Sequence, residues 1–125
     1  MANPASFTVN ALSANGSIAQ PAVQTIDTNG TVPIPAATPS DRLFLECVNS
    51  AANAIDVTVK GGVNPPSHLS RDLAVTIAAT TGKSIIGPFE SQRFTKADGS
   101  FDVQFQAASG APNLAVRVYR LPKQI

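Results

Sequence analysis

The strongest constraint in this sequence is a repeated alternation of apolar and polar residues with a period of two. It is clearest in residues 54–60, 73–78, 101–106 and 114–119. In a β-strand, a period of two places alternate side chains on opposite faces, one toward a core and one toward solvent. Turn signals separate these segments at intervals of about 8–12 residues, a spacing typical of all-β sandwiches and barrels.

Other segments extend this pattern. Residues 43–48 form a nearly continuous apolar run that suits a central strand, and residues 83–86 predict a short strand that the Gly-Pro pair at 87–88 ends. Residues 89–94 are a candidate for the start of another strand. The Asp-Gly pair at 98–99 is a hairpin signal leading into the next alternating segment. No window shows apolar residues at helical spacing without a glycine or proline inside it.

Residues 1–40 differ in texture from the rest of the chain. They hold five of the ten prolines and one charged side chain, Asp27. Proline fixes φ and lacks an N–H, so this segment favours extended chain and turns, with a strand expected within residues 22–26. Two interpretations stay open: a segment along the edge of its own domain, or an arm that reaches a neighbouring subunit.

These observations predict a single all-β domain. Its 125 residues suit one domain, and 43% hydrophobic residues are enough for a buried core. Without helices for parallel crossovers, the sheets should be mainly antiparallel. We expect a two-sheet sandwich of jelly-roll or immunoglobulin-like type, with a small β-barrel as the alternative. Residues 1–40 form its Pro-rich extended N-terminal segment and residues 41–125 its β-sandwich core.

Residues that commonly carry chemistry are sparse. His68, the single histidine, is in a loop, and Cys47, the single cysteine, is in an apolar strand where a thiol is usually inert. Asp98 and Asp102 flank a turn without the spacing of a calcium loop, and one cysteine with one histidine cannot make a zinc site. No nucleophile elbow or phosphate-binding loop is present. The sequence therefore predicts no enzyme, with no catalytic, cofactor-binding or metal-binding residues.

Charge and aromatic content argue against nucleic acid as a partner. Charged residues are 14%, the net charge is +1, and the chain has no Trp and one Tyr. A nucleic-acid interface normally concentrates basic residues and stacking platforms. Arg117 and Arg120, near Tyr119, either line a binding face or are charges on an edge strand that deter aggregation. The N-terminus does not read as a signal peptide, and no apolar run approaches the ~18 residues of a membrane span.

The order of several segments resembles small proteins encoded among the virion genes of tailed bacteriophages. The most specific piece is 86–89, Ile-Gly-Pro-Phe, followed by a β-rich C-terminus. The pieces that carry the resemblance are residues 12–21, 26–27, 42–49, 57–60, 75–79, 83–89 and 116–121. Together they span most of the chain. What the resemblance implies is a head decoration or minor capsid protein, a class that commonly forms β-rich trimers outside an icosahedral shell and has no catalytic residues to carry over.

We therefore expect a structural virion protein, a capsid decoration (cement) protein that binds the outside of the assembled head and stabilises it. The resemblance implies the major capsid protein as partner, a homo-oligomer with a trimer favoured, and a location on the capsid surface after synthesis in the host cytoplasm. No nucleic-acid, membrane or small-molecule partner is expected. The alternatives are a tail or head-tail junction protein, or a carbohydrate- or cell-surface-binding β-sandwich module.

Overall fold

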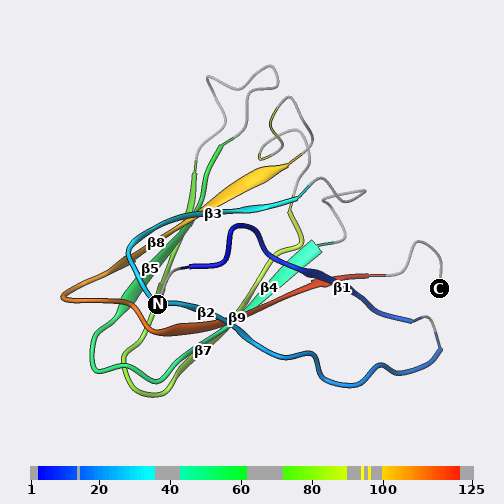
Figure 1. The fold of residues 1–125 in the computed structure, drawn as a ribbon, viewed down its shortest axis with the longest axis horizontal. Coiled ribbons are helices and arrows are strands. Elements are labelled where there is room, and N and C mark those ends of the chain that lie inside the picture. Colours follow the sequence, from blue (N-terminus) through cyan, green and yellow to red (C-terminus); the bar gives the residue numbers. More distant parts are fainter. Residues whose placement is uncertain are drawn as a thin grey trace.

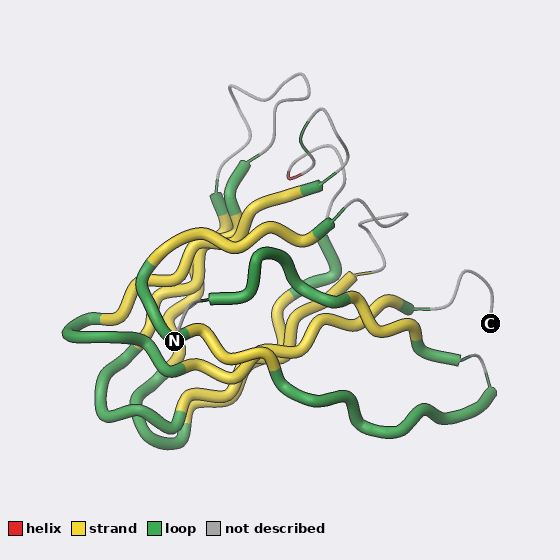
Figure 2. Tube along the Cα trace, in the orientation of Figure 1, coloured by secondary structure: helices red, strands yellow, loops and turns green. Residues whose placement is uncertain are grey.

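The computed structural model describes residues 3–13, 15–35, 43–61, 72–89, 94, 96 and 100–121. These residues form nine strands in two sheets, which lie as two layers in Figures 1 and 2. The strands are β1 (Val9–Ala11), β2 (Gln24–Ile26), β3 (Gly30–Ile34), β4 (Leu43–Asn49), β5 (Ile55–Val59), β6 (Leu73–Ile77), β7 (Gly82–Ile86), β8 (Phe101–Ala107) and β9 (Leu114–Arg120).

The strand order is that of a jelly roll. Sheet A has the order β1-β9-β4-β7, with β2 also paired to β9, and sheet B has the order β3-β8-β5-β6. The antiparallel pairs β2–β9, β3–β8, β4–β7 and β5–β6 nest inside one another, as in a long antiparallel ribbon rolled into two sheets. The predicted all-β sandwich is confirmed, and the barrel alternative is wrong because the sheets do not close.

One pairing departs from the expected antiparallel pattern. β1 runs parallel to β9, with Val9 opposite Val118. β2 pairs antiparallel with the other half of the same edge, where Ile26 lies opposite Leu114. The chain therefore leaves the edge of β9 after β1 and returns to it at β2. We call the intervening segment the N-terminal loop (residues 12–13 and 15–23).

The core lies between the inward faces of the two sheets. In β4, Leu43, Leu45 and Cys47 are fully buried and alternate with half-buried residues. Segments on both sides of residue 41 contribute to the same cluster, because Phe7 packs edge-on against Phe105 with ring centroids 5.9 Å apart. Burial of these side chains, each contributing about 1.5–3 kcal/mol, is the main force holding the sheets together.

Six of the predicted strands correspond to β4 through β9, and the segment 22–26 contains β2. The alternation did not reveal β1, which has three residues, or β3, which contains Pro33. Proline is compatible with β3 because that strand is at the edge of sheet B. Of the candidate strand at 89–94, Phe89 is not in a strand, and 90–93 lie outside the described residues, as does the Asp-Gly turn at 98–99.

A buried polar side chain ties the loops at one end of the sandwich together. Asn49 is fully buried at the end of β4. Its amide Nδ2 donates to the carbonyl oxygens of Asn53 (2.9 Å) and Ala78 (3.0 Å), and its Oδ1 accepts from the N–H of Ala51 (2.9 Å). Thr80 N–H also donates to Ala51 O at 2.7 Å. The β4–β5 and β6–β7 connections are thus joined through one side chain.

Candidate binding surface

The outer face of sheet A is the most varied surface that the described residues present. Alternation along three neighbouring strands places one set of side chains there, opposite the core. The set comprises Phe44, Glu46 and Val48 of β4, Lys83 and Ile85 of β7, and Arg117 and Tyr119 of β9. The face combines an ion pair, two stacked rings and an exposed aliphatic side chain, which is a mixture suited to contact with another macromolecule.

An ion pair crosses from β4 to β9. Arg117 Nη1 lies 2.8 Å from Glu46 Oε1, and Arg117 Nε donates to the carbonyl oxygen of Pro21 at 2.8 Å. One guanidinium therefore holds the β4 carboxylate and the N-terminal loop at the same time. Charge-assisted bonds of this kind are stronger than neutral ones, and the planar guanidinium fixes their directions.

The position of β9 within sheet A excludes one of the two interpretations of its charges. β9 pairs with β4 on one side and with β1 and β2 on the other. The interpretation of Arg117 and Arg120 as edge-strand charges is therefore wrong. Arg117 and Tyr119 share the outer face of sheet A. Arg120 is in register with the buried Leu43, so by alternation along the strand it belongs to the opposite face.

Tyr119 is part of the same cluster. Its ring stacks on Phe44 with centroids 5.2 Å apart and an interplanar angle of 23°. Desolvation raises the pKa of Tyr119, the charge of Glu46 and a hydrogen bond to that carboxylate raise it further, and Arg117 lowers it. The phenol is therefore neutral at physiological pH and donates to Glu46. The Glu46 carboxylate is therefore bound by both Arg117 and Tyr119, which share the outer face of β9.

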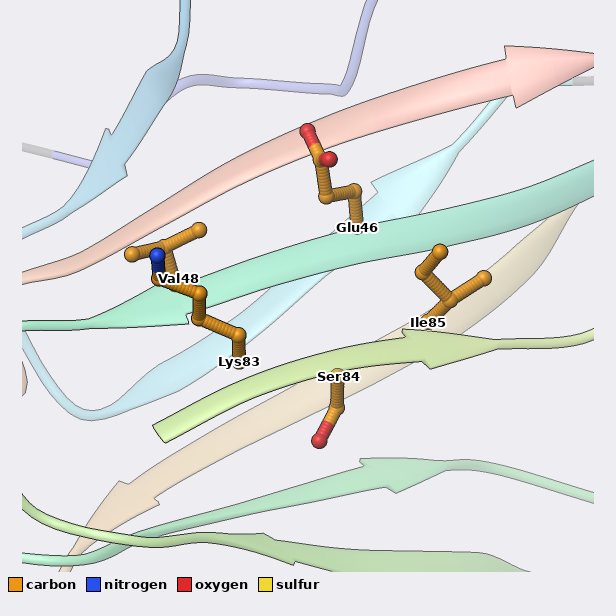
Figure 3. A pocket seen from close by; sticks show the side chains of 5 residues that line it. All are labelled: Glu46, Val48, Lys83, Ser84 and Ile85. Carbon is orange, nitrogen blue, oxygen red and sulfur yellow. The ribbon is translucent and has the colours of Figure 1, made fainter. Parts of the chain in front are cut away.

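A shallow hollow of about 350 Å³ lies beside this cluster, at the β7 border of sheet A. It is lined by Glu46, Val48, Lys83, Ser84 and Ile85. In Figure 3 the Ser84 side chain points away from the side on which Glu46 and Ile85 stand. Ile85 is 68% exposed, compared with 40% for Val23 and 37% for Ile18, the other exposed large hydrophobic residues of the described part.

The N-terminal loop borders the opposite side of sheet A. Residues 12–23 contain no charged side chain, and Ile18 and Val23 are exposed. Figures 1 and 2 show the loop running out from β1 and returning to β2. Its base is fixed at one end by a bond from Leu12 N–H to Arg120 O (2.9 Å), and at the other by the contact between Pro21 and Arg117.

Of the residues considered for chemistry, the structure describes Cys47 and Asp102, which lie in different sheets. Cys47 is in the core, and Asp102 pairs with Lys96 at 3.1 Å. His68 and Asp98 lie outside the described residues. Within the described ranges, no group of three or more His, Cys, Asp or Glu side chains could hold a metal ion. Those ranges also contain no helix long and apolar enough to cross a membrane.

The Cys47 thiol should be unreactive in the folded protein. Burial, with a smaller contribution from the neighbouring charge of Glu46, raises the pKa of Cys47 to about 12. Since the thiolate is the reactive form, a thiol reagent at pH 8 should modify native protein at least about 100-fold more slowly than protein in denaturant. Rapid modification without denaturant would contradict the burial of this side chain.

Comparison with known proteins gives no relative. The sequence matches no family model, and neither a curated protein nor a solved structure matches the chain. The resemblance to phage virion proteins therefore stays a prediction.

Proposed function

We propose that this protein is a structural component of a phage particle, a decoration protein that binds the outside of the assembled head and stabilises it. The proposal combines the resemblance in the order of its segments with a jelly-roll fold, an architecture used by viral capsid domains and also by lectins. Because a fold alone does not define a function, the proposal depends on the surface features that the fold presents.

The observation that carries the proposal is the N-terminal loop. It is uncharged, exposes Ile18 and Val23, and is anchored at its base to β9. Anchoring reduces the conformational entropy that the loop loses when it binds. Exposed aliphatic side chains on a pre-positioned loop are suited to burial between subunits of a shell. In a homotrimer, which the resemblance favours, three such loops would act together.

The physical basis of the stabilisation is mass action. A protein that binds the assembled shell and not its separated subunits shifts the equilibrium toward the shell. The contribution of each site is modest, but an icosahedral lattice repeats it many times. Such a protein requires a rigid scaffold and complementary surfaces. The major capsid protein is the proposed partner.

The direct test is to mix the purified protein with expanded, undecorated phage capsids and examine them by electron microscopy. Added density at regular lattice sites on the outer surface is the expected result. The double variant Ile18→Ser, Val23→Ser should lower the occupancy of these sites by at least about tenfold, because two exposed aliphatic side chains lose their burial. The control is Ala74→Ser, Ala108→Ser, which alters two exposed residues outside the loop.

Two outcomes would overturn the proposal. Capsids without added density would exclude the decoration role, and density confined to the portal or the tail would place the protein at the head-tail junction or in the tail. Equal occupancy for the loop variant and its control would mean that the N-terminal loop does not contact the capsid. The expected oligomer is read from the symmetry of the density.

A carbohydrate- or cell-surface-binding module is the second candidate. The specific observation in its favour is the stacked pair Phe44 and Tyr119 on the outer face of sheet A, because sugar rings bind to aromatic surfaces. Both rings are half-buried, and Tyr119 already donates to Glu46, so little of the pair is free for stacking. A clear signal on a glycan array that Tyr119→Ala abolishes would favour this candidate over the decoration protein.

A further inference from the structure

The end strand β7 differs from the other sheet edges among the described residues. The far edge of sheet A is divided between β1 and β2, each of three residues, and the β3 edge of sheet B contains Pro33, which has no N–H. The β6 edge of sheet B has five residues like β7, but it exposes Ala74 and Thr76 and no large apolar side chain. Short strands and proline are recognised means of blocking edge-to-edge pairing. β7 has five residues, Gly82–Ile86, and no described strand pairs with its outer side.

β7 also exposes the most accessible large apolar side chain of the described residues. Ile85 is 68% exposed on the outer face and borders the hollow that Val48 and Lys83 help to line. A free row of backbone donors and acceptors next to an exposed aliphatic residue is a ready template for another strand. Lys83 forms no ion pair with any described residue, so its charge is available to a partner.

We propose that β7 pairs antiparallel with β7 of a second copy of this chain, about a two-fold axis at Ser84. This register sets Ser84 opposite Ser84 of the second copy, and Lys83 opposite Ile85. This register uses all five residues of β7. It would form about four to six main-chain hydrogen bonds, both if the N–H groups of the even-numbered residues point outward and if those of the odd-numbered residues do. Sheet A then continues across the axis into the sheet A of the second copy.

Charge complementarity selects this register. On the outer face Glu46 is in register with Ile85, and Val48 is in register with Lys83. In the paired sheet, Lys83 of one copy is therefore two strand spacings, about 10 Å between the Cβ atoms, from Glu46 of the other. The Glu46 carboxylate keeps its bonds to Arg117 and Tyr119, so the lysine is attracted to it across solvent without forming an ion pair, and the methylene groups of the lysine cover Ile85. Symmetry provides the contact twice.

A register centred on Ile85 lacks this complementarity. In that register the two Ile85 residues would face each other, and the two Glu46 carboxylates would lie in line behind them, one on each side of the axis. The paired region would also extend to Gly87, where φ of +125° departs from a regular strand. The net charge of +1 imposes little repulsion on two copies approaching one another. A single five-residue edge buries a small area, so the pairing belongs to the weak, transient class of interfaces.

This inference does not rest on the proposed function, and its test uses the protein alone. If the protein is also a trimer, the β7 contact joins neighbouring trimers two at a time; otherwise it produces a dimer. Analytical ultracentrifugation across the micromolar to millimolar range should show reversible association that begins with a doubling of mass. Ile85→Ser and Lys83→Glu should each raise the dissociation constant about tenfold or more, whereas Val23→Ser, an equivalent change on the N-terminal loop, should leave it unchanged.

Cysteine cross-linking tests the register itself. Residues directly opposite in an antiparallel pair have Cα atoms about 4.5–5.5 Å apart, a separation that a disulfide spans. Ser84→Cys should therefore give a disulfide-linked pair under mild oxidation. Lys83→Cys should not, since the two Lys83 Cα atoms would be about 8 Å apart. Because the native Cys47 is in register with Ser84 of the same chain, every cysteine variant is made in a Cys47→Ala background, which excludes an intrachain disulfide.

The double variant Lys83→Cys, Ile85→Cys should link again, because this register sets the two positions opposite each other. A folded protein that keeps one mass at all concentrations would overturn the proposal, and so would association without a Ser84→Cys link. Density on capsids combined with a constant mass in solution would refute the β7 contact and leave the decoration role intact.

Discussion

Replacing Gly87 by alanine is expected to lower the free energy of unfolding by about 2–5 kcal/mol. Gly87 has φ of +125°, a conformation that L side chains rarely adopt and that costs about 1–3 kcal/mol for other residues. A Cβ atom at this position would also lie 2.8 Å from the carbonyl oxygen of Leu43 and 2.9 Å from the Cβ of Phe44. Relieving those overlaps requires the start of β4 to move, with a cost typical of overpacking.

Substitutions at two other glycines measure separately the two causes of the stability loss at Gly87, backbone conformation and steric overlap. Gly110 has φ of +71° and open space around it, so Gly110→Ala should cost about 1–2 kcal/mol from backbone conformation alone. At Gly82, a Cβ would overlap the backbone of Ala78, so Gly82→Ala should report the cost of overlap. Urea unfolding followed by circular dichroism measures all three variants. Equal stabilities for the Gly87 and Gly110 variants would contradict the close approach of Gly87 to β4.

The position of Gly87 also gives a structural meaning to the most specific piece of the phage resemblance. Residues 86–89 leave the end of β7, pass against the first residues of β4 and enter the core at Phe89, whose ring contacts Phe94 and Phe101. The sequence Ile-Gly-Pro-Phe is thus a packed exit from a strand. Packing constraints explain why such a segment is recognisable, and they do not by themselves indicate a function.

The local alternation of apolar and polar residues was sufficient to predict most strands. It was not sufficient to predict the order of the strands in the two sheets. The alternation of Ile55, Val57 and Val59 identifies a half-buried strand without any knowledge of its neighbours. β3 escaped prediction because Pro33 suggests a break, and proline is acceptable there because the strand is at an edge. The jelly-roll order depends on pairings such as β2 with β9, which join residues about 90 positions apart and leave no short-range signal.

The residues of the candidate surface could likewise be predicted only in part, because their partners are distant in the sequence. Arg117 and Tyr119 could be selected as candidates from the sequence, but their partner Glu46 is 71 residues from Arg117 and belongs to a segment read as a core strand. Prolines and lack of charge singled out residues 1–40 as a whole, whereas the N-terminal loop within them and its anchoring by Arg117 required the fold. Ile85 was expected in a strand, yet its exposure depends on β7 being the last strand of sheet A.

Asn49→Ala is the second substitution with a large expected effect, a loss of about 2–4 kcal/mol in the free energy of unfolding. Truncation leaves the N–H of Ala51 and the carbonyl groups of Asn53 and Ala78, which are partly buried, without their partner inside the protein. A fully buried group left unsatisfied costs about 1–3 kcal/mol, so three partly buried groups together account for the expected loss. Water entering at the end of the sandwich would offset part of that cost. The control is Asn53→Ala, which removes one exposed bond to Ser109 O and should cost less than about 1 kcal/mol.

Asn49→Asp distinguishes loss of the amide donor from loss of volume. A carboxylate at this position still accepts from Ala51 N–H but faces the carbonyl oxygens of Asn53 and Ala78, so burial should raise its pKa above the unfolded value of about 3.9. A raised folded-state pKa contributes stability below the unfolded pKa, and that contribution is lost as the pH rises through the folded value. Relative to the wild type, the variant should therefore be least destabilised near pH 3.5 and most at pH 7, as measured by urea unfolding at both values. A destabilisation independent of pH would mean that the buried position is hydrated, because a solvated carboxylate has the same pKa in both states.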